Sequence, residues 1–296
     1  ARRVHQPLSA LPIMRIMVLG LRGFPGVQGG VETHAEHLYQ RLSTLGCEVE
    51  VLVRAPYWQA AAAQALPAIR FQPLWSPTRS GLEALAHSLL GVTYAALHRP
   101  DVLHIHAVGP ALVTPLARLL GLRVVVTHHG PDYDREKWSA GARAILRLGE
   151  RWGMRHAHAR IAISAVIQAL IARRHDRPSV CIPNGVELPA AQPPGPALAA
   201  FGLAPGRYVL NVSRLVPEKR QLDLIDAFQA AALPGWRLAL VGGLPSDDDY
   251  VARVRAAAAA AGPAVVLTGF QQGRALAELF ANAGLFVLPS THEGLP

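Results

Sequence analysis

Asn211-Val212-Ser213-Arg214-Leu215-Val216-Pro217-Glu218-Lys219 is the stretch that decides the fold, because it joins an expected strand to an expected helix. Residues 208–212 form a short apolar run, which predicts a buried strand. Pro217 suits a first helical position, where its fixed φ is favourable and its missing N–H is not needed. The apolar residues that follow repeat at helical spacing: Leu222, Ile225 and Phe228. We therefore expect a helix that begins at Pro217.

Two cations lie at this junction. Arg214 falls in the strand-to-helix loop and Lys219 in the first turn of the expected helix, where the helix dipole adds positive potential. A guanidinium offers a planar fork and an ammonium a point charge, which together suit a pyrophosphate. The ordinary alternative is that Arg214 pairs with a surface carboxylate and Lys219 is a solvated helix residue. The spacing alone leaves both open.

The composition is that of a globular protein. A length of 296 residues predicts two domains, and 51% hydrophobic residues are enough for two cores. The net charge of +9 favours polyanionic partners: nucleotide phosphates, anionic lipid headgroups or nucleic acid. Cys47 and Cys181 are too few for a disulfide framework. We find neither a spanning apolar run nor the apolar core of a signal peptide, and we therefore expect a cytoplasmic location.

The first half of the chain alternates apolar strand patterns with helical ones. Strands are expected at residues 16–19, 49–53, 102–106, 123–127, 160–163 and 180–182, and helices at residues 31–45, 81–98, 111–120 and 139–158. This alternation predicts a parallel sheet that binds ligands at the carboxyl ends of its strands. Residues 55–80, rich in alanine, proline and aromatic side chains, are expected to form a loose apolar flap.

A glycine-rich loop follows the first strand. Gly29 and Gly30 stand at the start of the helix expected at residues 31–45, where they would let the backbone approach a ligand closely. A plain tight turn is the alternative. The loop lacks the spaced glycines of a dinucleotide site and the lysine of a P-loop, so neither site is supported.

Histidines gather at the expected carboxyl ends of two strands. His104 and His106 alternate along one strand and so share a face, and His128 and His129 end the next strand. A metal site is one interpretation, but no cysteine, aspartate or glutamate nearby completes it. We therefore predict no metal and favour hydrogen bonds from imidazole to a sugar.

The helix expected at residues 139–158 carries a stripe of four arginines: Arg143, Arg147, Arg151 and Arg155. Such a stripe repels itself unless it faces an anionic surface, and a membrane headgroup layer would suit it. The alternative, slightly favoured, is a solvated face partly neutralised by Glu150.

The proline-rich segment 189–206 divides the chain into a first domain at residues 13–188 and a second at residues 207–296. The second domain also alternates strands and helices and is Rossmann-like. It stops just after a strand expected at residues 285–288, before the helix that should cover it.

Several motifs along the whole chain resemble those of family 4 retaining nucleotide-sugar glycosyltransferases, closest to members that build bacterial surface polysaccharides. The matching segments are residues 29–33 (Gly-Gly-Val-Glu-Thr), 127–130 (Thr-His-His-Gly), 183–186 (Pro-Asn-Gly-Val), 213–219, 269–270 (Gly-Phe) and 289–296. The resemblance implies an α/β protein of the GT-B fold. In that fold two Rossmann-like, doubly wound domains face each other across a cleft, here with the second domain truncated.

The resemblance also implies roles for individual residues. Arg214 and Lys219 would hold the donor diphosphate without a metal or other cofactor. Glu293, with Gly294 and Leu295, would bind the donor sugar. The other implied contacts are His129 near the reacting carbon, Gly29 and Gly30 near the phosphate or acceptor, and Gly269 and Phe270 near the base. The donor would be a UDP-, GDP- or dTDP-sugar and the acceptor a glycan or a lipid-linked sugar. An anionic membrane surface is a further expected partner, and nucleic acid is not expected.

Two features depart from the family pattern. Arg220 stands where many relatives have glycine, and the glutamate expected eight residues after Glu293, where it would bind ribose, lies beyond Pro296. We therefore expect these residues to be a fragment with little activity. Two alternatives to a transferase stay open: a catalytically incomplete sugar-nucleotide-binding fragment, and a GT-B-like epimerase that would use Asp101, Asp132 or Asp134.

Overall fold

The computed structural model describes residues 13–27, 29–78, 82–134, 138–185, 192–243, 249–291 and 293–294. Contacts between Cα atoms divide the chain into two compact units, one up to residue 186 and one from residue 187 to residue 294. Each unit has its own sheet, and we describe the two separately.

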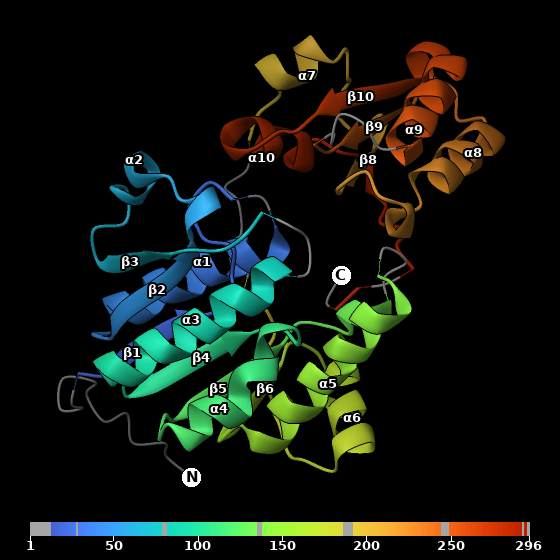
Figure 1. The fold of residues 1–296 in the computed structure, drawn as a ribbon. Helices are drawn as coiled ribbons and strands as arrows, with labels where there is room; N and C mark the ends of the chain where they lie inside the picture. The colour runs from blue at the N-terminus through green and yellow to red at the C-terminus, as the bar shows by residue number, and fades with distance from the viewer. Residues whose placement is uncertain are drawn as a thin grey trace, which may run out of the picture. The chain divides into compact units, whose positions relative to one another are not determined.

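The first unit contains a seven-stranded parallel sheet in the order β3-β2-β1-β4-β5-β6-β7 (Figure 1). Its central strands are almost continuously buried, as expected for a parallel sheet covered on both faces. The strands are β1 (Arg15–Leu19), β2 (Glu48–Arg54), β3 (Ile69–Leu74), β4 (Val102–His106), β5 (Val124–His128), β6 (Ala159–Ala162) and β7 (Val180–Cys181).

Helices pack on both faces of this sheet. Helix α1 (Gly30–Thr44) joins one core with β1 and β2. The other core contains α3 (Leu82–His98), α4 (Thr114–Leu119), α5 (Ala140–His156) and α6 (Ala165–His175), and Figure 1 shows α3, α4 and α5 side by side over the strands. Glu32, Ala35 and Tyr39 are the buried residues of α1, and Leu38 and Leu42 pack against the same core.

The flap expected at residues 55–80 is wrong for residues 69–74, which form a strand. After two short helical turns, η2 (Ala55–Tyr57) and α2 (Ala60–Ala63), the chain forms β3, which pairs in parallel with β2. Ile69 is buried, and Phe71 packs edge-on against Phe24. Pro73 lies within this strand, and an edge strand is where a sheet tolerates proline.

The second unit contains a four-stranded parallel sheet in the order β10-β9-β8-β11. The strands are β8 (Tyr208–Val212), β9 (Arg237–Val241), β10 (Val265–Gly269) and β11 (Leu285–Phe286). Helices α8 (Gln221–Ala231) and α9 (Asp249–Ala260) pack with one core, and α7 (Pro196–Ala200) and α10 (Gly273–Ala281) contribute to the other. This is the Rossmann-like arrangement expected from the alternating pattern.

Part of the segment predicted as a linker, residues 189–206, belongs to this second unit. Helix α7 buries Leu198, and the backbone N–H groups of Gly195 and Leu198 donate to the Glu278 carboxylate on α10 at 2.9 Å each. The proline-rich composition concealed this short helix, because Pro196 occupies its first turn rather than interrupting it. Residues 186–191 lie outside the described part of the chain.

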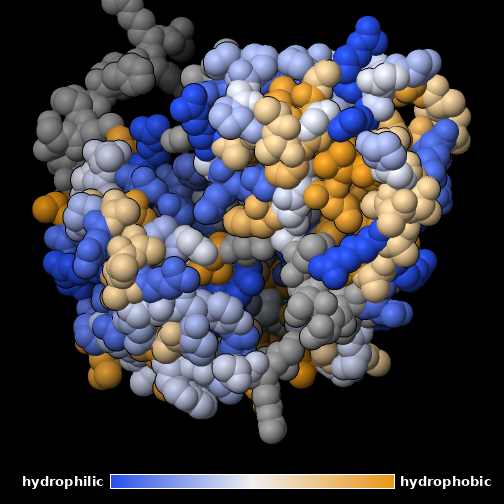
Figure 2. Space-filling model, turned by 90° about the horizontal axis from the view of Figure 1, so that it is seen from above, coloured by the Kyte–Doolittle hydropathy of each residue, from blue (hydrophilic) through white to orange (hydrophobic). Residues whose placement is uncertain are grey.

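Both units leave some large apolar side chains exposed. On the face drawn in Figure 2, apolar residues in orange lie among polar residues in blue. None of the helices in the described part of the chain is both long and apolar enough to span a bilayer.

Candidate functional site

Buried polar side chains form hydrogen bonds to the loop that follows β8. Asn211 and Gln221 are fully buried, and the Ser213 hydroxyl lies between them, donating to Asn211 Oδ1 and accepting from Gln221 Nε2 at 2.8 Å each. Gln221 Nε2 also donates to the Arg214 carbonyl at 2.8 Å, and its Oε1 accepts from the Tyr250 hydroxyl at 2.9 Å. Since each buried polar group has a partner, the network fixes the backbone that carries Arg214.

The sequence predicts a helix that begins at Pro217, and this prediction is wrong. Pro217–Lys219 form a 3₁₀ turn, η5, and α8 begins only at Gln221. Arg220 separates the two with φ of 54°, a left-handed conformation that an α-helix cannot continue through. This conformation explains why glycine is expected at position 220, and it places Lys219 in the turn before the helix rather than in the helix.

The Lys219 ammonium forms an ion pair with the Glu293 carboxylate. The two side chains leave 15% and 22% of their surface exposed. The segment that carries Glu293 returns over η5, because the Thr291 N–H donates to the Glu218 carbonyl at 3.0 Å. The structure therefore brings together two of the four predicted catalytic residues, Lys219 and Glu293. Arg214 is exposed in the loop between β8 and η5.

The carboxyl ends of β8, β9 and β10 meet beside this loop. The Gly242 N–H donates to the Gly269 carbonyl at 3.0 Å, and a Cβ on Gly242 would lie 2.1 Å from the Ser213 carbonyl oxygen. Gly269 has a positive φ of 72°, and the next residue, Phe270, leaves half of its surface exposed. Gly294 is described but Leu295 lies outside the described residues, so its predicted contact stays a prediction.

In the first unit, a buried chain of hydrogen bonds ends at His129. His129 Nε2 lies 2.9 Å from His106 Nδ1, and His106 Nε2 lies 2.5 Å from the Tyr39 hydroxyl. The same hydroxyl lies 2.8 Å from His104 Nδ1, and His104 Nε2 lies 2.7 Å from the Thr127 hydroxyl. The predicted shared face of His104 and His106 is confirmed, and their common partner is Tyr39 of α1.

Burial keeps these imidazoles neutral. Loss of hydration, together with neighbouring imidazoles, lowers the pKa of His104 to about 4 and that of His129 to about 3. The pKa values of His106 and His34 are also lowered, first by burial and then by neighbouring histidines. At neutral pH each ring therefore carries one proton and can donate only one hydrogen bond.

His128 does not join this chain of hydrogen bonds. Its Nδ1 accepts from the Gly130 N–H at 3.1 Å, and burial lowers its pKa, an effect that Glu150 opposes. No group of three or more histidine, cysteine or acidic side chains among the described residues is arranged to hold a metal ion.

The glycine pair at the start of α1 has two different environments. A Cβ on Gly29 would lie 2.0 Å from the Glu32 carboxylate, which accepts from Arg22 Nε at 2.9 Å, so Gly29 makes room for this ion pair. A Cβ on Gly30 would meet no atom within 4 Å. Gly30 therefore borders open space at the amino end of a helix, where backbone N–H groups can bind an anion.

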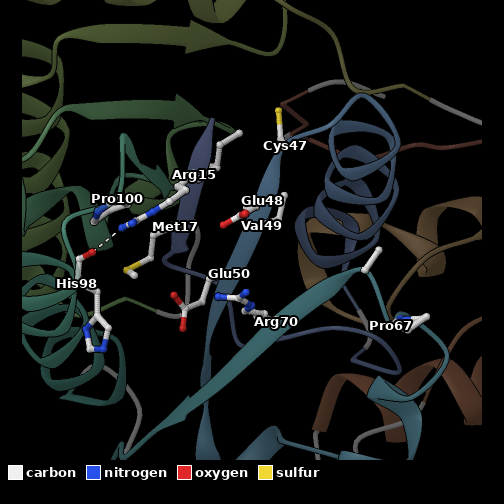
Figure 3. A pocket seen from close by; sticks show the side chains of 12 residues that line it. Arg15, Met17, Cys47, Glu48, Val49, Glu50, Pro67, Arg70, His98 and Pro100 are labelled. Carbon is white, nitrogen blue, oxygen red and sulfur yellow. Dashed lines mark hydrogen bonds between the residues drawn. The ribbon is translucent and has the colours of Figure 1, made fainter. Parts of the chain in front are cut away.

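A pocket of about 450 Å³ lies at the opposite edge of this sheet, where β1 and β2 begin (Figure 3). Two of its polar side chains, Arg15 and Glu50, bond to the protein itself. Arg15 donates to the carbonyls of His98 and Arg99 at 2.5 and 2.7 Å, and Glu50 accepts from the Tyr94 hydroxyl at 2.9 Å. None of the predicted site residues lines the described part of this pocket.

Sequence reasoning missed the residues that support the site. Asn211, Gln221 and Tyr250 form the hydrogen-bond network under the Arg214 loop, and Tyr39 connects to His129 through His106. A signal existed for Asn211, because it is a polar residue inside an apolar strand pattern. The others lie in helices and become visible only when the elements pack.

Two units with Rossmann-like parallel sheets define a GT-B type of α/β protein. The structure is similar to sucrose-phosphate synthase from Thermosynechococcus elongatus, with a TM-score of 0.76 at 22% identity, covering 96% of this chain and 77% of the other. It is also similar to HepE of Anabaena in complex with UDP and glucose, with a TM-score of 0.72 at 23% identity, covering 94% of this chain and 75% of the other. At this identity the likeness shows the fold alone.

The family follows from the sequence. Residues 28–189, more than half of the chain, match the family model of Glycosyltransferase Family 4, and residues 203–296 match that of Glycosyl transferases group 1. The chain belongs to glycosyltransferase family 4, as its motifs predicted.

A curated relative is 2-deoxystreptamine N-acetyl-D-glucosaminyltransferase from Streptomyces fradiae. It is 29% identical over 218 residues, which cover 67% of this chain and 51% of the relative. The match thus spans about half the length of that relative.

Proposed function

We propose that this protein transfers a sugar from a nucleotide-sugar donor to a glycan or lipid-linked acceptor with retention of configuration. The observation that carries the proposal is the pairing of Lys219 with Glu293 beside the exposed Arg214, at the carboxyl end of β8. This edge of an open parallel sheet is where ligands bind in Rossmann-like folds.

Arg214 and Lys219 would hold the donor diphosphate. Both cations are presented at the end of a strand, and one is already near a carboxylate that a donor sugar could use. As the bond between sugar and phosphate breaks, negative charge grows on the diphosphate, and two fixed cations stabilise that charge without a divalent metal. Glu293 and Gly294 would then face hydroxyls of the donor sugar, and Gly269 and exposed Phe270 the base.

In the first unit, the family resemblance gives roles to His129, Gly29 and Gly30. His129, neutral at physiological pH, would hydrogen-bond to the donor sugar near the reacting carbon. Gly30, with open space at its Cα, would let a phosphate or the acceptor approach the start of α1, and Gly29 would keep the turn compact.

We propose a UDP-sugar as the first donor to test. The similar structure of HepE was obtained with UDP and glucose, and the relative from Streptomyces fradiae is named for transfer of N-acetyl-D-glucosamine. GDP- and dTDP-sugars are the alternatives.

We also propose that the first unit binds the cytoplasmic face of an anionic membrane through α5, where surface polysaccharides are built. Three exposed arginines of this helix, Arg147, Arg151 and Arg155, adjoin three exposed apolar side chains, Ile145, Leu148 and Trp152. Cations beside apolar side chains suit a headgroup layer. The alternative expectation, that Glu150 partly neutralises the arginines, is wrong. The Glu150 carboxylate is buried and pairs with His175 at 2.7 Å.

The test is a thermal-shift screen of UDP-, GDP- and dTDP-sugars, followed by product analysis with and without an acceptor. Stabilisation by one donor and transfer to an acceptor would support the proposal. Binding without any conversion would favour the incomplete binding fragment, and conversion of the donor without an acceptor would favour an epimerase or hydrolase. Of the acids considered for an epimerase, Asp101 accepts from the Arg15 N–H at the far edge of the sheet, away from His129.

A further inference from the structure

The hydrogen bonds that end at His129 can run in only two directions. The Tyr39 hydroxyl has one proton and two imidazole partners, His104 Nδ1 and His106 Nε2, so it donates to one and accepts from the other. Because each neutral imidazole has a single N–H, this choice sets every other proton in the chain. The hydrogen bonds of the chain therefore reverse direction together, and only two arrangements of the protons are possible.

In the first arrangement Tyr39 donates to His104. His106 then donates to Tyr39 through Nε2–H, and His129 donates to His106 through its own Nε2–H. His104 donates from Nε2–H to the Thr127 hydroxyl, whose own proton then has no acceptor among the described residues. Thr127 is 2% exposed, so water does not easily supply one.

In the second arrangement Tyr39 donates to His106 Nε2. His106 then donates from Nδ1–H to His129 Nε2, and the proton of His129 must sit on Nδ1. At the other end, Thr127 donates to His104 Nε2 and its proton is satisfied. The two bonds donated by hydroxyls are then the shortest of the chain, 2.5 and 2.7 Å, as O–H donors prefer.

The two arrangements differ at the Thr127 end. His129 Nδ1 is buried and has no hydrogen-bond partner among the described residues in either case. The first arrangement adds an unpaired buried hydroxyl, which lowers its population by roughly 5- to 150-fold. The second is therefore the stable one.

We infer that Tyr39, His104, His106 and Thr127 are positioning residues that hold His129 as the tautomer with its proton on Nδ1. The Nδ1–H, buried in this structure, could donate to a ligand oxygen once a local rearrangement exposes it, and His129 has no free lone pair with which to act as a general base. The identity of that oxygen, a hydroxyl oxygen of the donor sugar, rests on the proposed function, but the tautomer does not.

The experiment is long-range ¹H–¹⁵N NMR of the whole protein labelled at histidine, which shows the protonated nitrogen of each imidazole. His129 is assigned by its loss in His129→Gln. We expect a proton on Nδ1 in the wild type, and a mixture of both tautomers in Tyr39→Phe, which removes the shared hydroxyl but keeps the ring that stacks on Phe24. Tyr94→Phe is the matched control, because its hydroxyl bonds Glu50 instead, and it should leave His129 unchanged.

A second pair of variants tests the other end. Thr127→Val removes the hydroxyl that decides the direction and should give a mixture, whereas Thr127→Ser keeps it and should retain the Nδ1 tautomer. A proton on Nε2 in the wild type, or no tautomer change in either Thr127→Val or folded Tyr39→Phe, would overturn the inference.

Activity gives an independent readout. Tyr39→Phe should lower kcat by roughly 5- to 10-fold, the effect of one misdirected hydrogen bond, with little change in KM for the donor. If the wild type transfers no sugar, the proposed function fails while the NMR result still decides the tautomer.

Discussion

Lys219 and Glu293 form an ion pair between Nζ and Oε1 although 74 residues separate them along the chain. In the proposed site the two groups have different ligands, since the ammonium would bind the diphosphate and the carboxylate the sugar. Without a donor, the ion pair fixes the positions of both side chains. When a donor binds, the ammonium would contact the diphosphate and the carboxylate would contact the sugar.

Glu293→Gln should separate sugar recognition from phosphate recognition. Loss of the carboxylate removes a charge-assisted hydrogen bond to the sugar, so turnover should fall roughly 10- to 100-fold. Affinity for UDP alone should stay equal or rise, because Lys219 is no longer neutralised. Calorimetry with UDP and steady-state kinetics measure the two effects. Glu218→Gln, one residue before Lys219, is the control, and equal losses in UDP binding and turnover would argue against the assignment.

His129→Ala should reduce turnover more than donor binding, because its proposed contact strengthens at the reacting carbon. We expect kcat to fall roughly 10- to 100-fold and the dissociation constant of the donor to change by less than about 3-fold. His98→Ala, at the opposite edge of the sheet, should leave both unchanged. An unchanged kcat in His129→Ala would indicate a structural histidine.

Arg147→Glu combined with Arg151→Glu should weaken binding to vesicles that contain phosphatidylserine. Each cation near such a surface contributes about 1 kcal/mol, so the partition coefficient should fall at least roughly 30-fold. Sedimentation with vesicles measures it, and added salt should reduce wild-type binding. Arg253→Glu with Arg255→Glu makes the same charge change on exposed positions of α9 and should have little effect. Equal wild-type binding to neutral vesicles would contradict the prediction.

Arg220→Gly should stabilise the protein. A non-glycine residue in the left-handed region costs about 1–2 kcal/mol, and the exposed ion pair of Arg220 with Asp223 returns less than about 1 kcal/mol. We expect the free energy of unfolding to rise by about 0.5–1 kcal/mol in urea titrations. Ala232→Gly, with φ of 44° at the end of α8 and no charge, should show a gain of about 1 kcal/mol and serves as the reference. A lower unfolding free energy in Arg220→Gly would show that Arg220 makes contacts worth more than its strain.

The order of strands and helices could be predicted because it depends on local patterns. Residues 16–19 and 208–212 are short, mostly apolar runs that predict buried strands, and they lie within or coincide with β1 and β8. β3 was missed because Pro73 argues against a strand unless the strand is known to be at an edge, and sequence does not give its place in the sheet.

The charged residues of the candidate site could be predicted, and the buried polar residues that support them could not. Lys219 was named from its place at the strand-to-helix junction. Glu293 was named only from the family resemblance, since nothing local relates residues 74 apart. Gln221 and Tyr250 could not be found, because buried polar networks have no periodicity. The helix start was placed four residues early, at Pro217 rather than Gln221, because the sequence does not reveal that Arg220 adopts a left-handed conformation.

The central claim is that Arg214 and Lys219 bind the diphosphate of a nucleotide sugar. Isothermal titration calorimetry with the UDP-sugar that stabilises the wild type most tests it directly. Arg214→Ala and Lys219→Ala should each weaken binding by roughly 10- to 1,000-fold, as expected for lost charge-assisted contacts to phosphate. Arg207→Ala, an exposed cation before the start of β8, should bind the donor as the wild type does. Wild-type affinity in folded Arg214→Ala and Lys219→Ala would contradict the claim.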